Sequence, residues 1–207
     1  MLYKKCKKCR RYGEKLFLKG DRCYTPKCAI TRRNYAPGIH GDTGKPKKMS
    51  EFGTQLFEKQ KAKKIYGLRE KQFKGYYQKA SKQRGVTGEK IAQLLETRLD
   101  NIVFRLGFAK SRNLSRQIVN HGHVLVNEKP VDIASHQLKI NDVVKIKNKS
   151  KANKYFVNIP KSIVKDSIPR WLDVNPKEYS GKVIAMPSLA DMDHSIGMKQ
   201  IIESYSK

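Results

Sequence analysis

LLETRLDNIVFRLGFAKSRNLSRQIVNHGHVLVN, residues 94–127, contains two hydrophobic periods in succession. Leu99, Val103 and Leu106 recur at the four- and three-residue spacing of an amphipathic helix. Beyond Gly122, apolar and polar residues alternate, which is typical of a strand with one buried face. The change of period predicts helices that lead directly into a small sheet.

A short helix is predicted from Ser111 to Gly122, where a glycine is a suitable stop. Its apolar side consists of Leu114, Ile118 and Val119. Arg112 and Arg116 lie four positions apart on the polar face, with Ser115 beside them. Helices that lead into a sheet and carry basic residues on one face make a compact shape suited to RNA binding.

The strand pattern continues on both sides of a turn. HVLVNEKPVDI alternates around Asn127–Pro130 and predicts a hairpin, and DVVKIKN, residues 142–148, predicts another strand. Beyond residue 150 the patterns predict a helix over 154–165 and strands near 182–186 and 200–205.

Two helices are predicted upstream. Ser50 is a suitable N-cap for a helix over 51–66 that ends at Gly67. A second helix is predicted over 69–84. One face of this helix is mainly aromatic and consists of Phe73, Tyr76, Tyr77 and Ala80. We expect this face to be part of the core and not a surface on which RNA bases stack.

The charge balance predicts a polyanionic partner. The chain has 45 Lys and Arg against 18 Asp and Glu, and residues 1–90 alone carry 26 basic and 7 acidic side chains. No apolar run approaches the roughly 18 residues that a membrane span requires. The N-terminus lacks the apolar core of a signal peptide. We therefore expect a cytoplasmic protein that binds nucleic acid and not a membrane.

All four cysteines lie near the N-terminus, in the pattern Cys6-x2-Cys9-x13-Cys23-x4-Cys28. Two close pairs joined by a loop can hold one tetrahedral zinc ion, and a site of four thiolates is structural. An iron–sulfur cluster accepts the same spacing but is the less favoured cofactor. Disulfides would need an oxidising compartment, which nothing in the sequence suggests.

Residues 29–49 are rich in glycine, proline and charge, and are expected to form an extended arm that RNA orders. The alternative is a disordered linker. The basic residues of this arm that could reach phosphates are Arg32, Arg33, Lys45, Lys47 and Lys48.

The sequence contains no Walker motif, no G-x-S-x-G and no H-E-x-x-H, and its five histidines form no metal or triad pattern. We therefore expect no catalytic residues, no small-molecule substrate and no enzyme activity.

Residues 94–127 resemble the S-four RNA-binding domain, and nearly all of the chain resembles the bacterial S-four family of small-subunit ribosomal proteins. The stretches LKGDRCYTPKCAITRR, YAPGIHG, EKQKAKKIYGLREKQF and GVTGEKIAQLLETRLDN follow the family's order. The hairpin departs from the family, because Asn127-Glu128 stands where Asn-Gly is commoner. Residues 150–207 match more loosely, apart from PRWLDV and ESYSK.

The resemblance implies a structural protein that binds small-subunit ribosomal RNA at a multi-helix junction and nucleates early assembly of the 5′ domain. It also implies a place near the entrance of the mRNA channel, a contribution to decoding accuracy, and contact with neighbouring ribosomal proteins, especially S-five. Some family members repress their own operon by binding its mRNA.

The RNA-binding role of the family transfers to matching positions of this chain. In the N-terminal region these are the basic residues, which include Arg10 and Arg11. In the S-four domain they are Arg98, Arg105, Ser111, Arg112, Ser115, Arg116, Gln117, His121 and Asn127.

Two other functions compete with this one. S-four domains also occur in pseudouridine synthases, which use an Arg-Leu-Asp tripeptide like Arg98-Leu99-Asp100 around a catalytic aspartate. Too few residues remain for a catalytic domain, so Asp100 is expected to be an N-cap or an arginine partner. A zinc-dependent nucleic-acid-binding regulator is the second alternative, but the basic residues here are spread along the chain, which suits folded RNA.

The predicted fold class is α+β, with a mainly helical domain into which the RNA-binding domain is inserted. The predicted parts are a four-cysteine metal-binding region and basic arm over 1–49, a helical part over 50–90, an S-four RNA-binding domain of helices packed on a small β-sheet over 91–150, and a C-terminal segment over 151–207 that packs back on the helical domain.

Overall fold

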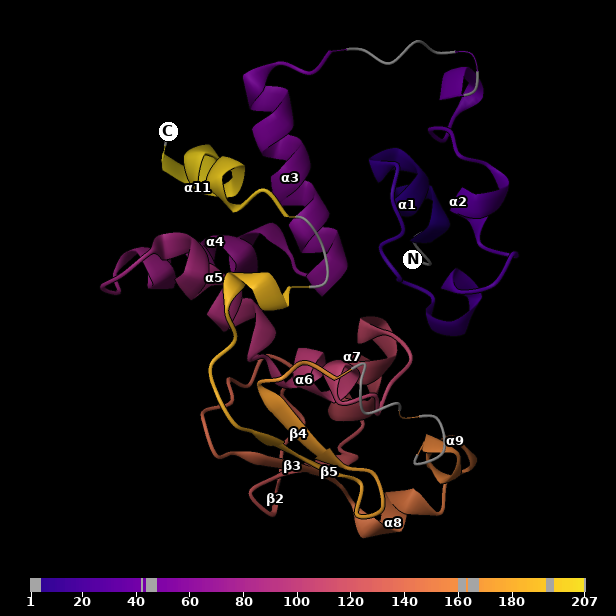
Figure 1. The fold of residues 1–207 in the computed structure, drawn as a ribbon, viewed down its shortest axis with the longest axis vertical. Coiled ribbons are helices and arrows are strands. Elements are labelled where there is room, and N and C mark those ends of the chain that lie inside the picture. The colour runs from indigo at the N-terminus through magenta and orange to yellow at the C-terminus, as the bar shows by residue number, and fades with distance from the viewer. Residues whose placement is uncertain are drawn as a thin grey trace. The chain divides into compact units, whose positions relative to one another are not determined.

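A computed structural model gives the structure of the chain and describes residues 5–41, 43, 48–159, 163, 168–192 and 196–206 (Figure 1). The chain divides into two compact units. The first consists of residues 1–78 and 194–207, and the second of residues 79–193.

The first unit begins with short elements around the cysteines. They are α1 (Lys5–Tyr12), η1 (Gly20–Cys23), α2 (Ala29–Arg32) and η2 (Ile39–Gly41). The predicted arm over 29–49 thus contains two single turns, and its Lys45 and Lys47 lie outside the described residues. An ion pair of 2.8 Å between Lys61 and Glu14 and a contact between the rings of Tyr12 and Phe57 join this region to the next helix.

Two longer helices follow, as predicted: α3 (Glu51–Tyr66) and α4 (Glu70–Ser81). The Ser50 hydroxyl accepts a hydrogen bond from the Gly53 N–H, and Gly67 closes α3 in the left-handed conformation. The aromatic face of α4 is core, since Phe73 and Ala80 are buried. The predicted end of α4 was three residues too late, because no apolar residue after Ala80 faces the core.

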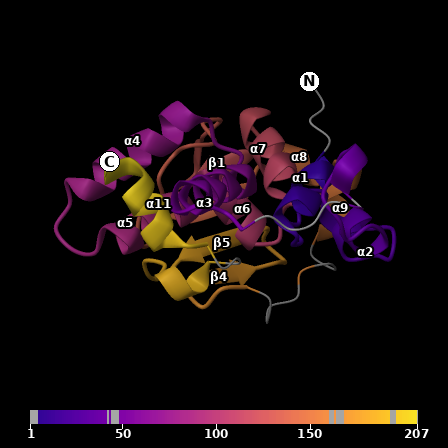
Figure 2. The ribbon, with the colours of Figure 1, turned by 90° about the horizontal axis from the view of Figure 1, so that it is seen from above.

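The predicted strand near 200–205 is wrong, because this segment is the helix α11 (Met198–Ser206). Figure 2 shows α11 beside α3, and the two helices are in extensive contact. Met198 and Ile201 are buried at helical spacing, and Gln55 on α3 donates a hydrogen bond to Glu203. A short apolar run fits either period, and here packing against α3 favours the helix.

The second unit is built from helices and one antiparallel sheet. The helices are α5 (Thr87–Glu96), α6 (Leu99–Arg105) and α7 (Arg112–Asn120). The strands are β1 (Val124–Val126), β2 (Lys129–Pro130), β3 (Val143–Ile146), β4 (Leu172–Asn175) and β5 (Ser180–Val183), in the order β2-β1-β3-β5-β4. The predicted hairpin and the strand within 142–148 are confirmed.

The sheet extends beyond the predicted end of the RNA-binding domain at residue 150. β5 pairs with β3, and β4, which the sequence reading missed, pairs with β5. The strand expected near 182–186 lies slightly earlier, at β5. Between β3 and β4 the chain forms α8 (Asn148–Lys151) and α9 (Lys154–Val157), so the predicted helix over 154–165 begins correctly, but α9 ends at Val157. Residues 160–162 and 164–167 of that prediction lie outside the described residues.

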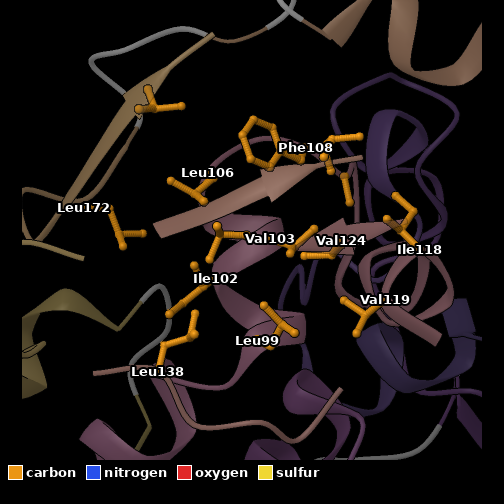
Figure 3. Close-up of a cluster of buried hydrophobic side chains, with 14 of the residues drawn as sticks. Leu99, Ile102, Val103, Leu106, Phe108, Ile118, Val119, Val124, Leu138 and Leu172 are labelled. Carbon is orange, nitrogen blue, oxygen red and sulfur yellow. The ribbon is translucent and has the colours of Figure 1, made fainter. Parts of the chain in front are cut away.

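One hydrophobic cluster joins the helices of the second unit to its sheet (Figure 3). Leu99 and Val103 of α6 and its C-cap residue Leu106 are completely buried. Their partners include Ile118 and Val119 from α7, Val124 from β1 and Leu172 from β4. The core therefore fixes α6 and α7 on the sheet, and these helices with their capping residues carry most of the RNA contacts predicted for the second unit.

Candidate nucleic-acid interface

Asp100 on α6 is a buried carboxylate bound by an arginine fork. Arg98 Nε donates to Asp100 Oδ1 at 3.0 Å, and Arg98 Nη2 donates to Oδ2 at 2.9 Å. Arg98 is 2% exposed and Asp100 is 3% exposed, so both ions are inside the protein. A bidentate pair of this kind satisfies two charges that would be costly to bury singly.

A second arginine, from α7, reaches the same carboxylate. Arg116 Nε donates to Asp100 Oδ2 at 2.9 Å, and its Nη2 donates to the same oxygen at 2.5 Å. The Arg116 side chain is 30% exposed, unlike that of Arg98. The Ser115 hydroxyl donates to the Asp100 carbonyl, so α7 is attached to α6 at neighbouring positions.

A parallel network links α5, α6 and α7. Arg105 forms a bidentate pair with Glu96, with both hydrogen bonds at 2.9 Å. Asn101 Nδ2 donates to Glu96 Oε2 at 2.7 Å, and Arg112 Nε donates to Asn101 Oδ1 at 2.8 Å. The Arg112 guanidinium also lies over the Phe104 ring, 4.5 Å from its centroid. Arg112 is therefore held in place by a chain of buried polar groups.

The exposed side of α7 is polar. Asn113, Gln117, Asn120 and His121 are exposed, while Arg112 and Arg116 are half-buried beside them. Ser111 is buried as the N-cap of α7, and its hydroxyl accepts from the Leu114 N–H. These partly exposed arginines and amides give α7 a surface that can donate to phosphate oxygens.

Asn127, the last of the predicted contacts in this unit, is exposed in the hairpin turn. Its side chain accepts from the Val143 N–H at 2.9 Å and donates to Asp142 Oδ1 at 2.8 Å. Asn127 and Glu128 both have positive φ, 48° and 64°, as in a type I′ turn. Asn127 thus fixes the turn to β3, and its contact with RNA stays a prediction.

The structure separates the predicted residues of the second unit into two groups. Arg112, Arg116, Gln117, His121 and Asn127 are exposed or half-buried, so they are available to a partner. Arg98, Arg105, Ser111 and Ser115 are buried and bound to protein groups, a position that argues against direct contact with RNA. Sequence reasoning missed Glu96 and Asn101, which are the acceptor of the Arg105 pair and the link from that pair to Arg112.

The same geometry bears on the enzymatic alternative. A catalytic aspartate must reach its substrate, but the Asp100 carboxylate is buried and occupied by two arginines. Asp100 is also not the N-cap of α6, because Arg98 occupies that position. The prediction that Asp100 is an arginine partner is confirmed.

The first unit carries a basic cavity of about 330 Å³. Its charged lining residues are Lys5, Lys7, Arg10, Lys19, Arg22, Lys27, Arg32 and Arg33. Arg10 donates to the carbonyls of Tyr35 and Ala36, at 2.9 and 3.1 Å, and lies over the Tyr35 ring. Arg10, Arg32 and Arg33 therefore meet at one cavity, whereas Arg11 and Lys48 are exposed elsewhere.

The four cysteines line one small cavity beside the basic one. Cys9, Cys23 and Cys28 are buried and Cys6 is half-buried, all as free thiols. Burial raises the pKa of Cys9. Burial acts in the same direction on Cys28, but hydrogen bonds from the backbone of Ile30 and Thr31 lower the pKa of that thiol overall. Among the described residues, no group of three or more His, Cys, Asp or Glu side chains is arranged to hold a metal, so a formed metal knob is not shown.

Two family models match the chain in succession. "Ribosomal protein S4/S9 N-terminal domain" matches residues 1–96, and "S4 domain" matches residues 97–144. Together with the fold, they define a ribosomal protein of the S4 class. In the described part of the chain, no helix is both long and apolar enough to span a membrane.

Several named relatives are similar over almost the whole chain. Small ribosomal subunit protein uS4A of Clostridium perfringens (strain SM101 / Type A) is 53% identical over 205 residues, which cover 98% of this chain and 96% of the relative. The uS4 proteins of Clostridium botulinum (strain Eklund 17B / Type B) and Clostridium beijerinckii have the same identity and coverage. The chain belongs to the uS4 family.

Proposed function

We propose that the chain is a structural, non-enzymatic protein of the small ribosomal subunit that binds small-subunit ribosomal RNA directly. The observation that carries this proposal is the pair Arg112 and Arg116 on one face of α7, each held by a buried acceptor. Guanidinium groups can donate two hydrogen bonds to a phosphate, and proteins recognise folded RNA largely through its shape and its phosphates. The net charge of +27 supplies long-range attraction to the same partner.

The basic cavity supports a second area of RNA contact. Its eight basic side chains come from several segments of residues 5–33 and line one cavity. Each phosphate that such a side chain neutralises releases counterions, which makes affinity depend on salt. We therefore assign the first unit, as well as α7, to RNA binding. The finer roles are part of this proposal: early assembly of the 5′ domain, contact with protein S-five and with mRNA, and support of decoding accuracy.

A single structural zinc ion is also proposed, bound by Cys6, Cys9, Cys23 and Cys28. Four thiols are the donor set that zinc prefers. They line one cavity, and an iron–sulfur cluster is the less favoured group for the same four ligands. A bound ion would cross-link α1 to the turn before α2 and thereby stabilise the wall that the cysteines share with the basic cavity.

The test is footprinting of the purified full-length chain on small-subunit ribosomal RNA. We expect protection of a discrete junction, with an affinity that falls as salt rises. Duplex DNA should compete poorly. Protection spread evenly over the RNA, or equal competition by duplex DNA, would contradict the proposal and favour the nucleic-acid-binding regulator.

A further inference from the structure

The carboxylate of Asp100 is shared by two arginines that differ in exposure. Arg98 approaches from the start of α6 and is 2% exposed, whereas the Arg116 side chain is 30% exposed. Arg98, Asp100 and Arg116 together carry two positive charges and one negative charge. The burial of Arg98 places the accessible part of the positive charge at Arg116.

Asp100 is itself fixed from several directions. Its N–H donates to the Ala134 carbonyl at 3.1 Å, and its own carbonyl accepts from the Ser115 hydroxyl. The Arg98 fork holds both carboxylate oxygens. The orientation of Asp100 is therefore set by the fold before any partner binds.

We infer that Asp100 is a positioning residue for RNA binding, which holds the Arg116 guanidinium in the orientation that a phosphate requires. The inference rests on the proposed function. An arginine that is ordered only on binding loses side-chain conformational entropy at that step, which lowers the affinity. Asp100 already orders Arg116 in the free protein. The side-chain entropy of Arg116 is therefore lost on folding and not on RNA binding, so the affinity for RNA is higher.

Charge and positioning predict opposite results when Asp100 is neutralised. A carboxylate close to a polyanion is repelled by it, so Asp100→Asn should strengthen RNA binding if only charge matters. Positioning predicts weaker binding, because the neutral amide holds Arg116 less firmly. The sign of the change therefore distinguishes the two explanations.

The experiment measures the dissociation constant of the full-length chain for small-subunit ribosomal RNA at fixed salt. Asp132→Asn is the matched control, since it removes an exposed carboxylate of the same unit outside this cluster. We expect the control to bind as tightly as the parent or more tightly, and Asp100→Asn to bind roughly tenfold more weakly, in line with the entropy that Asp100 removes. Once Arg116→Ala is present, Asp100→Asn should cause no additional loss.

Arg116→Lys gives a second readout that does not depend on changing a buried residue. Lysine keeps the positive charge but lacks the planar guanidinium that Asp100 holds through two N–H groups. We therefore expect the Arg116→Lys variant to bind RNA almost as weakly as Arg116→Ala. Binding at the parent level by Arg116→Lys or by folded Asp100→Asn would overturn the inference, as would independent losses in the double variant. Failure of the parent chain to bind the RNA would instead contradict the proposed function.

Discussion

Tyr205, in the last helix of the chain, donates a hydrogen bond from its hydroxyl to Glu70 on α4 at 2.7 Å, across 135 positions of sequence. The Tyr205 ring stacks on the Tyr77 ring, with the ring centroids 4.9 Å apart, and Lys59 Nζ lies over the Tyr205 ring, 4.8 Å from its centroid. The first unit is therefore completed by a helix from the end of the chain, packed against helices far away in sequence.

Glu70 should make the stability of the first unit depend on pH. Burial acts to raise the pKa of Glu70, but hydrogen bonds from Lys63 and Tyr205, with the nearby lysine charges, lower it overall from 4.5. A lowered pKa gives stability that is present above pH 4.5 and is lost as pH falls through the folded-state pKa. Glu70→Gln should therefore destabilise the chain at pH 7, and the difference from the parent should shrink below pH 4.5. Urea unfolding at several pH values measures it, and a pH-independent difference would contradict the role of the charge.

Replacing Glu128 by glycine should stabilise the hairpin turn between β1 and β2. Glu128 has φ of 64°, a conformation that glycine adopts without strain, and its exposed ion pair with Lys145 contributes little. We expect Glu128→Gly to raise the free energy of unfolding by about 0.5–1 kcal/mol. The control is Glu128→Ala, which loses the ion pair but keeps the strain and should not stabilise. Chemical denaturation measures both, and a loss of stability with glycine would show that the ion pair outweighs the strain.

Gly181 on β5 should tolerate no side chain. A Cβ at this position would overlap the Leu106 side chain in the core. We expect Gly181→Ala to destabilise the second unit by about 1–3 kcal/mol, the usual effect of overpacking. Gly75→Ala is the matched control, because a Cβ there meets open space on helix α4, and alanine should stabilise that helix by about 1 kcal/mol. Thermal unfolding of both variants measures the contrast, and equal stability of the two would contradict the packing argument.

Periodicity predicted the elements that are long or clearly patterned. The helices α3 and α4 and the β1–β2 hairpin follow from local spacing and caps such as Ser50. It failed for α11, whose conformation is decided by its packing against α3, far away in sequence, and it missed β4, which pairs with the adjacent strand β5. Ile201, for example, is completely buried in the first unit, which a short apolar run cannot reveal.

Residue types indicated the candidate site, but burial reassigned several of its members. Arg98 and Arg105 belong to the same basic pattern as Arg112 and Arg116 in the sequence. They differ in burial: Arg98 and Arg105 are enclosed together with their carboxylate partners, Asp100 and Glu96, whereas Arg112 and Arg116 are half-buried on α7. Which arginine is enclosed depends on how α5, α6 and α7 pack, and no local spacing specifies that.

Arg112 should contribute to RNA binding without contributing much to stability. Its guanidinium is half-buried, held by Asn101 and stacked on Phe104, so it is oriented on the surface of α7. We expect Arg112→Ala to weaken binding to small-subunit ribosomal RNA by about 1–3 kcal/mol and to leave the melting temperature nearly unchanged. The neighbouring exposed Asn113→Ala serves as the control and should change both little. Normal binding together with early melting would identify Arg112 as a purely structural residue.

The cysteine cavity should bind one metal ion per chain. The four thiols that line this cavity are proposed to hold zinc, and metal binding to such a set contributes on the order of 10–16 kcal/mol in small zinc-finger peptides. Chelation should therefore increase amide exchange in residues 5–33 while residues 87–146 stay protected. Cys23→Ser should have the same local effect, because a hydroxyl replaces one buried thiolate ligand. Metal analysis of reduced, untagged protein gives the stoichiometry: one zinc is the expected result, iron would indicate a cluster, and a value near zero would refute the metal site.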